Sequence, residues 1–160
     1  MELKFELKIK IQKPVEDVFN AVHDPDKLSG YFTNGGASGP LDEGATVSWK
    51  FDDNPGEKPV EGDVYVKKVV PNDLIVLEWM GAADHLTRTE INFERVNASE
   101  TVVRIAETGW EENQSDLDRS YMNCFGWSQM ICSLKAYLEY GINLRKGAFG
   151  GLYKTAGQSG

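Results

Sequence analysis

Cysteine, histidine, runs of one charge and long apolar stretches are all scarce in this 160-residue chain. The two cysteines, Cys124 and Cys132, are eight positions apart, which on one helix is a rise of about 12 Å. A disulfide requires α-carbons within about 7 Å of each other, so we expect two free thiols. Neither cysteine has a metal-binding spacing, and we interpret both as small buried hydrophobic residues.

No apolar run approaches the roughly 18 residues that a membrane-spanning helix needs. The first segment, MELKFELKIKIQ, alternates charged and apolar residues, whereas a signal peptide carries a continuous apolar stretch. We therefore expect a cytoplasmic protein that does not act at a membrane.

Positive charge is also sparse, because no run of Lys or Arg is present and the net charge is −8. Nucleic acids and anionic membranes bind clustered positive charge, so both are disfavoured as partners. The sequence lacks a nucleophile elbow, a phosphate-binding loop with its lysine and a zinc-ligand spacing. We interpret its two histidines, His23 and His85, as surface or capping residues, and we expect no cofactor and no metal.

The apolar pattern predicts many short strands and few helices. Alternation predicts a half-buried strand at 2–12, and helical spacing after Pro14 predicts a helix that ends near His23, followed by a second short helix at 26–32. Turn residues separate the other predicted strands, which lie at 37–41, 45–51, 60–70, 74–80, 86–96 and 101–108. Because most connections are short, an antiparallel meander is expected.

One long amphipathic helix is predicted near the C-terminus, capped by Ser115 or Asp116 and extending to about Arg145, with Gly141 weakening its last turn. Its apolar residues recur at spacings of four, three, four and four: Trp127, Ile131, Leu134, Leu138 and Ile142. We expect residues 1–147 to form a single domain and the glycine-rich residues 148–160 to form a flexible tail.

Four segments carry a resemblance to a known family. They are KPVEDVFNAVHDPDKLSGYFTNGGASGPLDEGATVSWKF, VVPNDLIVLEW, TVVRIAETGW and NCFGWSQMICSLKAYLEYGINLR. Together they resemble the START/Bet v 1-like superfamily, often called SRPBCC, and within it the branch related to the activator of the heat-shock-protein-90 ATPase. The resemblance implies an α+β helix-grip fold, in which a curved antiparallel sheet of about six to seven strands wraps a long C-terminal helix, with two short helices after the first strand. It also implies a hydrophobic pocket between sheet and helix.

Candidate pocket residues follow from strand parity and from aromatic residues expected near the cavity mouth. Glu107 shares the parity of Val103 and Ile105, so we expect it either at the open end of the cavity or hydrogen-bonded to a ligand. The full candidate set is Tyr31, Phe32, Trp49, Phe51, Trp79, Phe93, Glu107, Trp110, Tyr121, Trp127 and Met130.

Three functions remain open at this point. The first is binding of a small hydrophobic molecule, which is lipid-like, polyketide-like or aromatic. The second is a chaperone-activator-like module that binds a protein partner, and the third is a cyclase or hydrolase-type enzyme using Glu107 or His85 as acid or base. The sequence does not place an acid and a base together, which favours a binding protein over an enzyme. A cavity behind Trp127 larger than a few water molecules would favour ligand binding over the interaction module.

Overall fold

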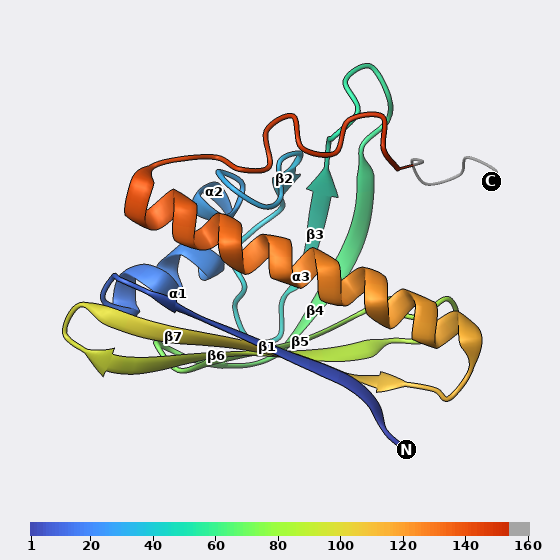
Figure 1. Ribbon diagram of the computed structural model, residues 1–160, viewed down its shortest axis with the longest axis horizontal. Coiled ribbons are helices and arrows are strands. Elements are labelled where there is room, and N and C mark those ends of the chain that lie inside the picture. The colour runs from blue at the N-terminus through green and yellow to red at the C-terminus, as the bar shows by residue number, and fades with distance from the viewer. Residues whose placement is uncertain (154–160) are drawn as a thin grey trace.

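The computed structural model describes residues 1–153 and contains one sheet and one long helix (Figure 1). The elements in chain order are β1 (Leu3–Ile11), α1 (Val15–His23), α2 (Pro25–Leu28), β2 (Gly36–Ala37), β3 (Thr46–Phe51), β4 (Val60–Val70), β5 (Leu74–Trp79), β6 (Thr87–Asn97), β7 (Glu100–Trp110) and α3 (Gln114–Tyr140). The predicted α+β order is confirmed.

All seven strands form one antiparallel sheet in the order β1-β7-β6-β5-β4-β3-β2. Strands β3 to β7 form a meander, and β1 joins the sheet beside β7. The sheet curves, and α3 lies across one face of it (Figure 1). Side chains that the parity rule places inward are buried in one core together with residues of α1 and α3: Trp49, Val64, Val66, Ile75, Leu77, Ile91, Phe93, Val103 and Ile105.

Helix α3 begins and ends at different residues from those predicted. Its N-cap is Asn113, whose side-chain oxygen accepts from the Asp116 N–H at 2.8 Å, so a cap at Ser115 or Asp116 is wrong. Asp116 lies inside the first turn and accepts instead from the N–H of Glu111 at 2.6 Å. The helix ends at Tyr140 because Gly141 has φ of 67°, a left-handed conformation that favours glycine. Residues 141–153 then run back along α3 toward the loop between β3 and β4 (Figure 1), and we call this segment the strap.

Other differences are local. Helix α2 stops at Leu28, short of the predicted residue 32, and β2 has two residues in place of the five predicted. Both cysteines are free, as predicted, but Cys132 is exposed and Cys124 is half-buried, so their predicted burial is wrong. The buried stripe of α3 runs through Trp127, Met130, Ile131 and Leu134. Cys132 follows Ile131, and because each helical residue is rotated by about 100° from the one before it, the Cys132 side chain faces away from the core.

The C-terminal end of the edge strand β1 is covered by two side chains from α3. Lys135 donates from Nζ to the backbone oxygen of Lys10 at 3.0 Å, and the Gln12 N–H donates to Glu139 Oε2 at 3.0 Å. Lys135 and Glu139 also pair with each other. The helix thereby satisfies backbone groups at the end of an edge strand.

The strap makes specific contacts at its far end. The Gly151 N–H donates to Asn54 Oδ1 at 2.7 Å, and the Phe149 ring lies 6.3 Å from that of Phe125 on α3. Part of the predicted flexible tail, residues 154–160, lies outside the described residues, and the predicted boundary at 147 stays a prediction. Among residues 1–153, no helix is both long enough and apolar enough to cross a membrane.

Candidate functional site

Four aromatic rings from four parts of the chain meet beneath α3. Phe32 follows α2, Trp49 lies on β3, Trp79 on β5 and Trp127 on α3. Ring centroids are 5.4 Å apart for Phe32 and Trp49, 5.9 Å for Trp49 and Trp79, 5.4 Å for Trp79 and Trp127, and 5.8 Å for Phe32 and Trp127. The four rings therefore form a closed circuit, which we call the aromatic cluster.

A fully buried carboxylate, Glu107 on β7, holds two of these indoles in place. Trp127 donates from Nε1 to Oε1 at 3.0 Å, and Trp79 donates from Nε1 to Oε2 at 3.1 Å. Thr87 donates to Oε2 at 2.6 Å, and Asn123 donates from Nδ2 to the same oxygen at 3.0 Å. All four neighbours are donors, as an acceptor-only carboxylate requires. The prediction that Glu107 lies at the open end of the cavity is therefore wrong. Its side chain is fully buried, and its oxygens accept hydrogen bonds from four protein groups.

A cavity of about 160 Å³ lies between α3 and the sheet, beside the aromatic cluster. Its walls are Phe32, Phe51, Trp79, Met122, Asn123, Gly126, Trp127 and Arg145. A second cavity of about 170 Å³ shares Met122, Gly126 and Arg145 with the first and extends outward beneath the strap. One water occupies about 30 Å³ of liquid, and an apolar cavity of about 150 Å³ accepts benzene. The first cavity is therefore large enough for one aromatic ring.

Gly126 keeps this space open. A β-carbon added at this position of α3 would meet no atom within 4 Å. Glycine in a helix interior costs about 1 kcal/mol relative to alanine, so residue 126 lowers helix stability while leaving room in the cavity wall.

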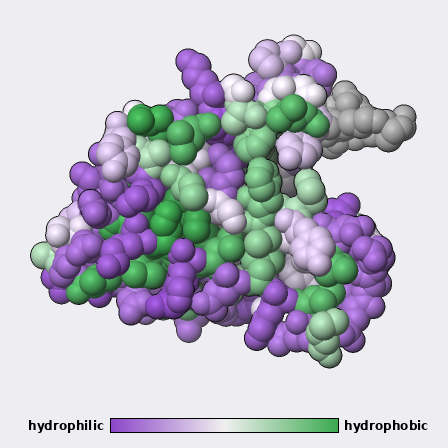
Figure 2. Space-filling model, in the orientation of Figure 1, coloured by the Kyte–Doolittle hydropathy of each residue, from purple (hydrophilic) through white to green (hydrophobic). Residues whose placement is uncertain are grey.

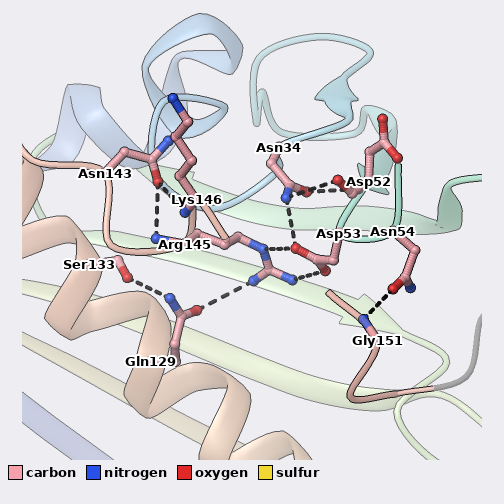
Figure 3. Close-up of polar contacts among 10 residues, drawn as sticks. All are labelled: Asn34, Asp52, Asp53, Asn54, Gln129, Ser133, Asn143, Arg145, Lys146 and Gly151. Atoms are coloured by element: carbon pink, nitrogen blue, oxygen red, sulfur yellow. Dashed lines mark hydrogen bonds and ion pairs between the residues drawn. The ribbon is translucent and has the colours of Figure 1, made fainter. Parts of the chain in front are cut away.

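Arg145 on the strap lines both cavities. Its side chain extends between Asp53, on the loop after β3, and Gln129 on α3 (Figure 3). Its Nε donates to Asp53 Oδ1 at 3.1 Å and its Nη2 to Asp53 Oδ2 at 2.7 Å, and Nη1 makes a longer contact of 3.4 Å with Gln129 Oε1. The guanidinium also lies over Phe51 at 4.8 Å and over Phe149 at 5.0 Å from the ring centres. These contacts leave only 11% of the Arg145 side chain exposed.

The predicted site residues divide into four groups by position. Phe32, Phe51, Trp79 and Trp127 line the cavity, and Trp49 and Glu107 pack behind this wall. Four others are buried but do not line the cavity: Tyr31, Phe93, Trp110 and Met130. Tyr31 donates its hydroxyl to the oxygen of Ala21 at 2.9 Å, and Phe93 packs against Phe19. Tyr121 is 64% exposed on α3.

Sequence reasoning missed Met122, Asn123, Gly126 and Arg145 as cavity residues. For Gly126 a signal existed, because a glycine beside a tryptophan interrupts an otherwise strong helical pattern. Arg145 was predicted to lie at the end of the helix, whereas the helix ends at Tyr140 and Arg145 lies on the strap, where it pairs with Asp53.

His85 lies apart from the residues that line the cavity. Its Nδ1 hydrogen-bonds with Asp84 at 2.8 Å, and its Nε2 with the oxygen of Gly109 at 2.9 Å, while Asp116 lies 3.3 Å from Nε2. The hydrogen bond with Asp84, followed by that with Gly109, raises the pKa of His85 above its ordinary value of 6.5. These contacts fix the loop after β5 against the start of α3. Within residues 1–153, no group of three His, Cys, Asp or Glu side chains is arranged to hold a metal ion.

A curved antiparallel sheet around one long C-terminal helix, with two short helices after the first strand, defines the helix-grip class of α+β domains. Residues 12–139 match the family described as activator of Hsp90 ATPase homolog 1-like protein. The chain belongs to this family, and the resemblance noted from its sequence is confirmed. No curated protein matches the chain significantly.

Solved structures agree with this assignment. The protein SSP2350 from Staphylococcus saprophyticus is 27% identical with a TM-score of 0.73, over 90% of this chain and 97% of that one. The Aha1 dimer from Colwellia psychrerythraea is 25% identical with a TM-score of 0.65, over 87% and 98%. DynU16, from the dynemicin biosynthetic locus, shares the fold at 22% identity and a TM-score of 0.72, over 90% of this chain and 50% of its own.

Proposed function

We propose that this chain binds one small apolar molecule with an aromatic ring in the cavity between α3 and the sheet. The observation that supports this most is Gly126, an energetically unfavourable helix residue that leaves the cavity wall empty beside Trp127. The aromatic rings of Phe32, Phe51 and Trp79 form most of the remaining wall. A ring inserted among them buries apolar surface and stacks against their faces.

The cavity also offers a polar group that orients a ligand. The amide nitrogen of Asn123 donates to both Glu107 oxygens, at 3.0 and 3.3 Å, which fixes the orientation of the amide because the carboxylate accepts only. Asn123 also lines the cavity, so its amide is a polar group in a mainly apolar wall. An apolar wall with few polar groups is typical of small-molecule sites.

A pair of substitutions at Gly126 tests the proposal without removing any contact. Gly126→Leu fills the cavity with a side chain, whereas Gly126→Ala adds one methyl group and serves as the matched control. Both are expected to fold at least as stably as the parent, with Ala gaining up to about 1 kcal/mol in the free energy of unfolding. Binding of toluene, followed by the indole N–H signal of Trp127 in NMR titrations, should weaken at least about tenfold in the Leu variant and little in the Ala variant.

Two results would contradict the proposal. One is that the parent protein binds neither toluene nor any molecule that co-purifies with it and is detected by mass spectrometry. The other is that Gly126→Leu binds toluene as tightly as the parent, since the ligand would then lie outside the cavity.

A protein partner is a second candidate, supported by an exposed apolar surface. Tyr121, Met122 and Phe125 on α3 and Leu152 on the strap are each more than half exposed. Figure 2 shows hydrophobic side chains gathered over α3 and along the strap above it. The family description names activation of the Hsp90 ATPase. The test is the ATPase rate of Hsp90 measured with and without this chain. If the chain stimulates the rate, and if Phe125→Ser removes the stimulation while Gly126→Leu preserves it, the exposed surface and not the cavity binds the protein partner.

A further inference from the structure

Arg145 has hydrogen-bonding capacity that the protein does not use. A guanidinium carries five N–H groups. Asp53 takes one from Nε and one from Nη2, and Gln129 takes one from Nη1 at 3.4 Å. Two N–H groups, one on each Nη, therefore have no partner among residues 1–153. Since Arg145 lines both cavities and its side chain is only 11% exposed, these donors are available mainly to a molecule in the cavity.

The charge of Arg145 is already balanced. Asp53 pairs with it through both carboxylate oxygens, at 3.1 and 2.7 Å, in the two-bond geometry that binds carboxylates most strongly. An anionic ligand at the free Nη groups would place a second carboxylate beside Asp53, in a protein whose net charge is −8. A negative ligand is therefore disfavoured, although an arginine stands at the site.

A positive ligand is disfavoured for a different reason. Aromatic walls of this kind attract cations to their ring faces. Here the guanidinium of Arg145 already occupies the faces of Phe51, at 4.8 Å, and Phe149, at 5.0 Å. A second cation in the same small cavity would be repelled by Arg145. The site thus discriminates against charge of either sign.

We propose that the ligand is a neutral aromatic carbonyl compound, such as an aryl amide, ketone or ester. Its ring lies against Trp79 and Trp127, and its carbonyl oxygen accepts from the two free Nη–H groups of Arg145. This assignment rests on the function proposed above, and it makes Arg145 and Asp53 the residues that determine ligand charge.

Four probes of the same ring and similar size separate the alternatives: benzamide is neutral, benzoate negative, benzamidine positive, and toluene has no acceptor. Affinities are measured by NMR titration of the indole N–H signals of Trp79 and Trp127. Benzamide is expected to bind at least about tenfold more tightly than each of the other three.

Substitution of Asp53 tests the cause of the preference. Asp53→Asn keeps a side-chain oxygen near Arg145 but removes the balancing charge, so benzoate should then bind at least as tightly as benzamide. The matched control is Asp52→Asn, the same change one residue away on an exposed side chain, which should leave the preference for benzamide unchanged. If Asp53→Asn fails to fold, Arg145→Met supplies the second test, because it should reduce benzamide binding to the level of toluene.

The outcomes separate the two proposals. If toluene or benzoate binds the parent protein as tightly as benzamide, or if Asp53→Asn leaves the preference unchanged, the assignment of a neutral carbonyl ligand is wrong while ring binding stands. If none of the four probes binds, ring binding in this cavity fails, and the assignment of the ligand fails with it.

Discussion

Replacing Glu107 by glutamine should destabilise the protein strongly, although the two side chains have nearly the same shape. Trp79 and Thr87 donate to Oε2, and Trp127 donates to Oε1. A glutamine has a single oxygen, so if this oxygen takes the Oε2 position, the indole N–H of Trp127 faces the new amide nitrogen. Both buried groups then lack an acceptor.

A buried donor without an acceptor costs about 1–3 kcal/mol. With two such groups, Glu107→Gln is expected to lower the free energy of unfolding by about 2–6 kcal/mol, which is large against a total of about 5–15 kcal/mol. The melting temperature should fall by at least about 4 °C, because 1 kcal/mol corresponds to about 2–4 °C in a chain of this size. Urea denaturation followed by tryptophan fluorescence measures the change directly.

The control is Glu61→Gln on β4, an exposed carboxylate 3.7 Å from Lys50, where the loss should stay below about 0.5 kcal/mol. A loss for Glu107→Gln no larger than that of the control would refute the reasoning. It would mean that the four donors around residue 107 do not depend on a carboxylate for their hydrogen bonds.

Three further outcomes are expected. The NMR titration midpoint of His85 should lie above 6.5 and should fall when Asp84 is replaced by asparagine. The folding stability contributed by charged His85 is complete below about pH 6.5 and is lost as the pH rises through the higher folded-state pKa. Gly81→Ala should cost about 1–3 kcal/mol, because its β-carbon would lie 2.0 Å from the hydroxyl of Thr87, whereas an exposed glycine with open space should tolerate alanine. Burial acts to raise the pKa of Glu139, but hydrogen bonds from Lys135 and the Gln12 N–H outweigh it, and the pKa is lowered. The contribution of ionised Glu139 to folding stability is therefore complete above about pH 4.5 and is lost as the pH falls through the folded-state pKa. Acid unfolding of Glu139→Gln should lack this pH-dependent loss of stability.

Strand faces could be predicted from the sequence because each strand has one buried face and side chains alternate with a period of two. The inward positions of Trp49, Ile91 and Ile105 follow from that rule alone. Element ends were less accurate, because residues 113, 115 and 116 are all types that cap helices well and only the path of the chain decides among them.

The site could be predicted only in part. Parity placed Glu107 inside, but its four donors come from β5, β6 and α3, and no local pattern relates these elements. The pairing of Arg145 with Asp53 joins residues 92 positions apart and depends on the chain reversing at Gly141. The aromatic residues of the cavity wall could therefore be predicted from a single sequence, but the contact between Arg145 and Asp53 could not.

The cover that α3 places over β1 has a consequence for how copies of this chain can associate. Edge strands with free backbone groups recruit further strands and are the usual starting points of fibril growth. Here the end of one edge strand meets Lys135 and Glu139, and the exposed positions of that strand are all charged, while the other edge, β2, has only two residues. The β2 edge is therefore too short to be a template for strand addition, and on β1 the contacts from α3 block extension at the end near Lys10 and Gln12, where copies of the chain can meet only through side chains.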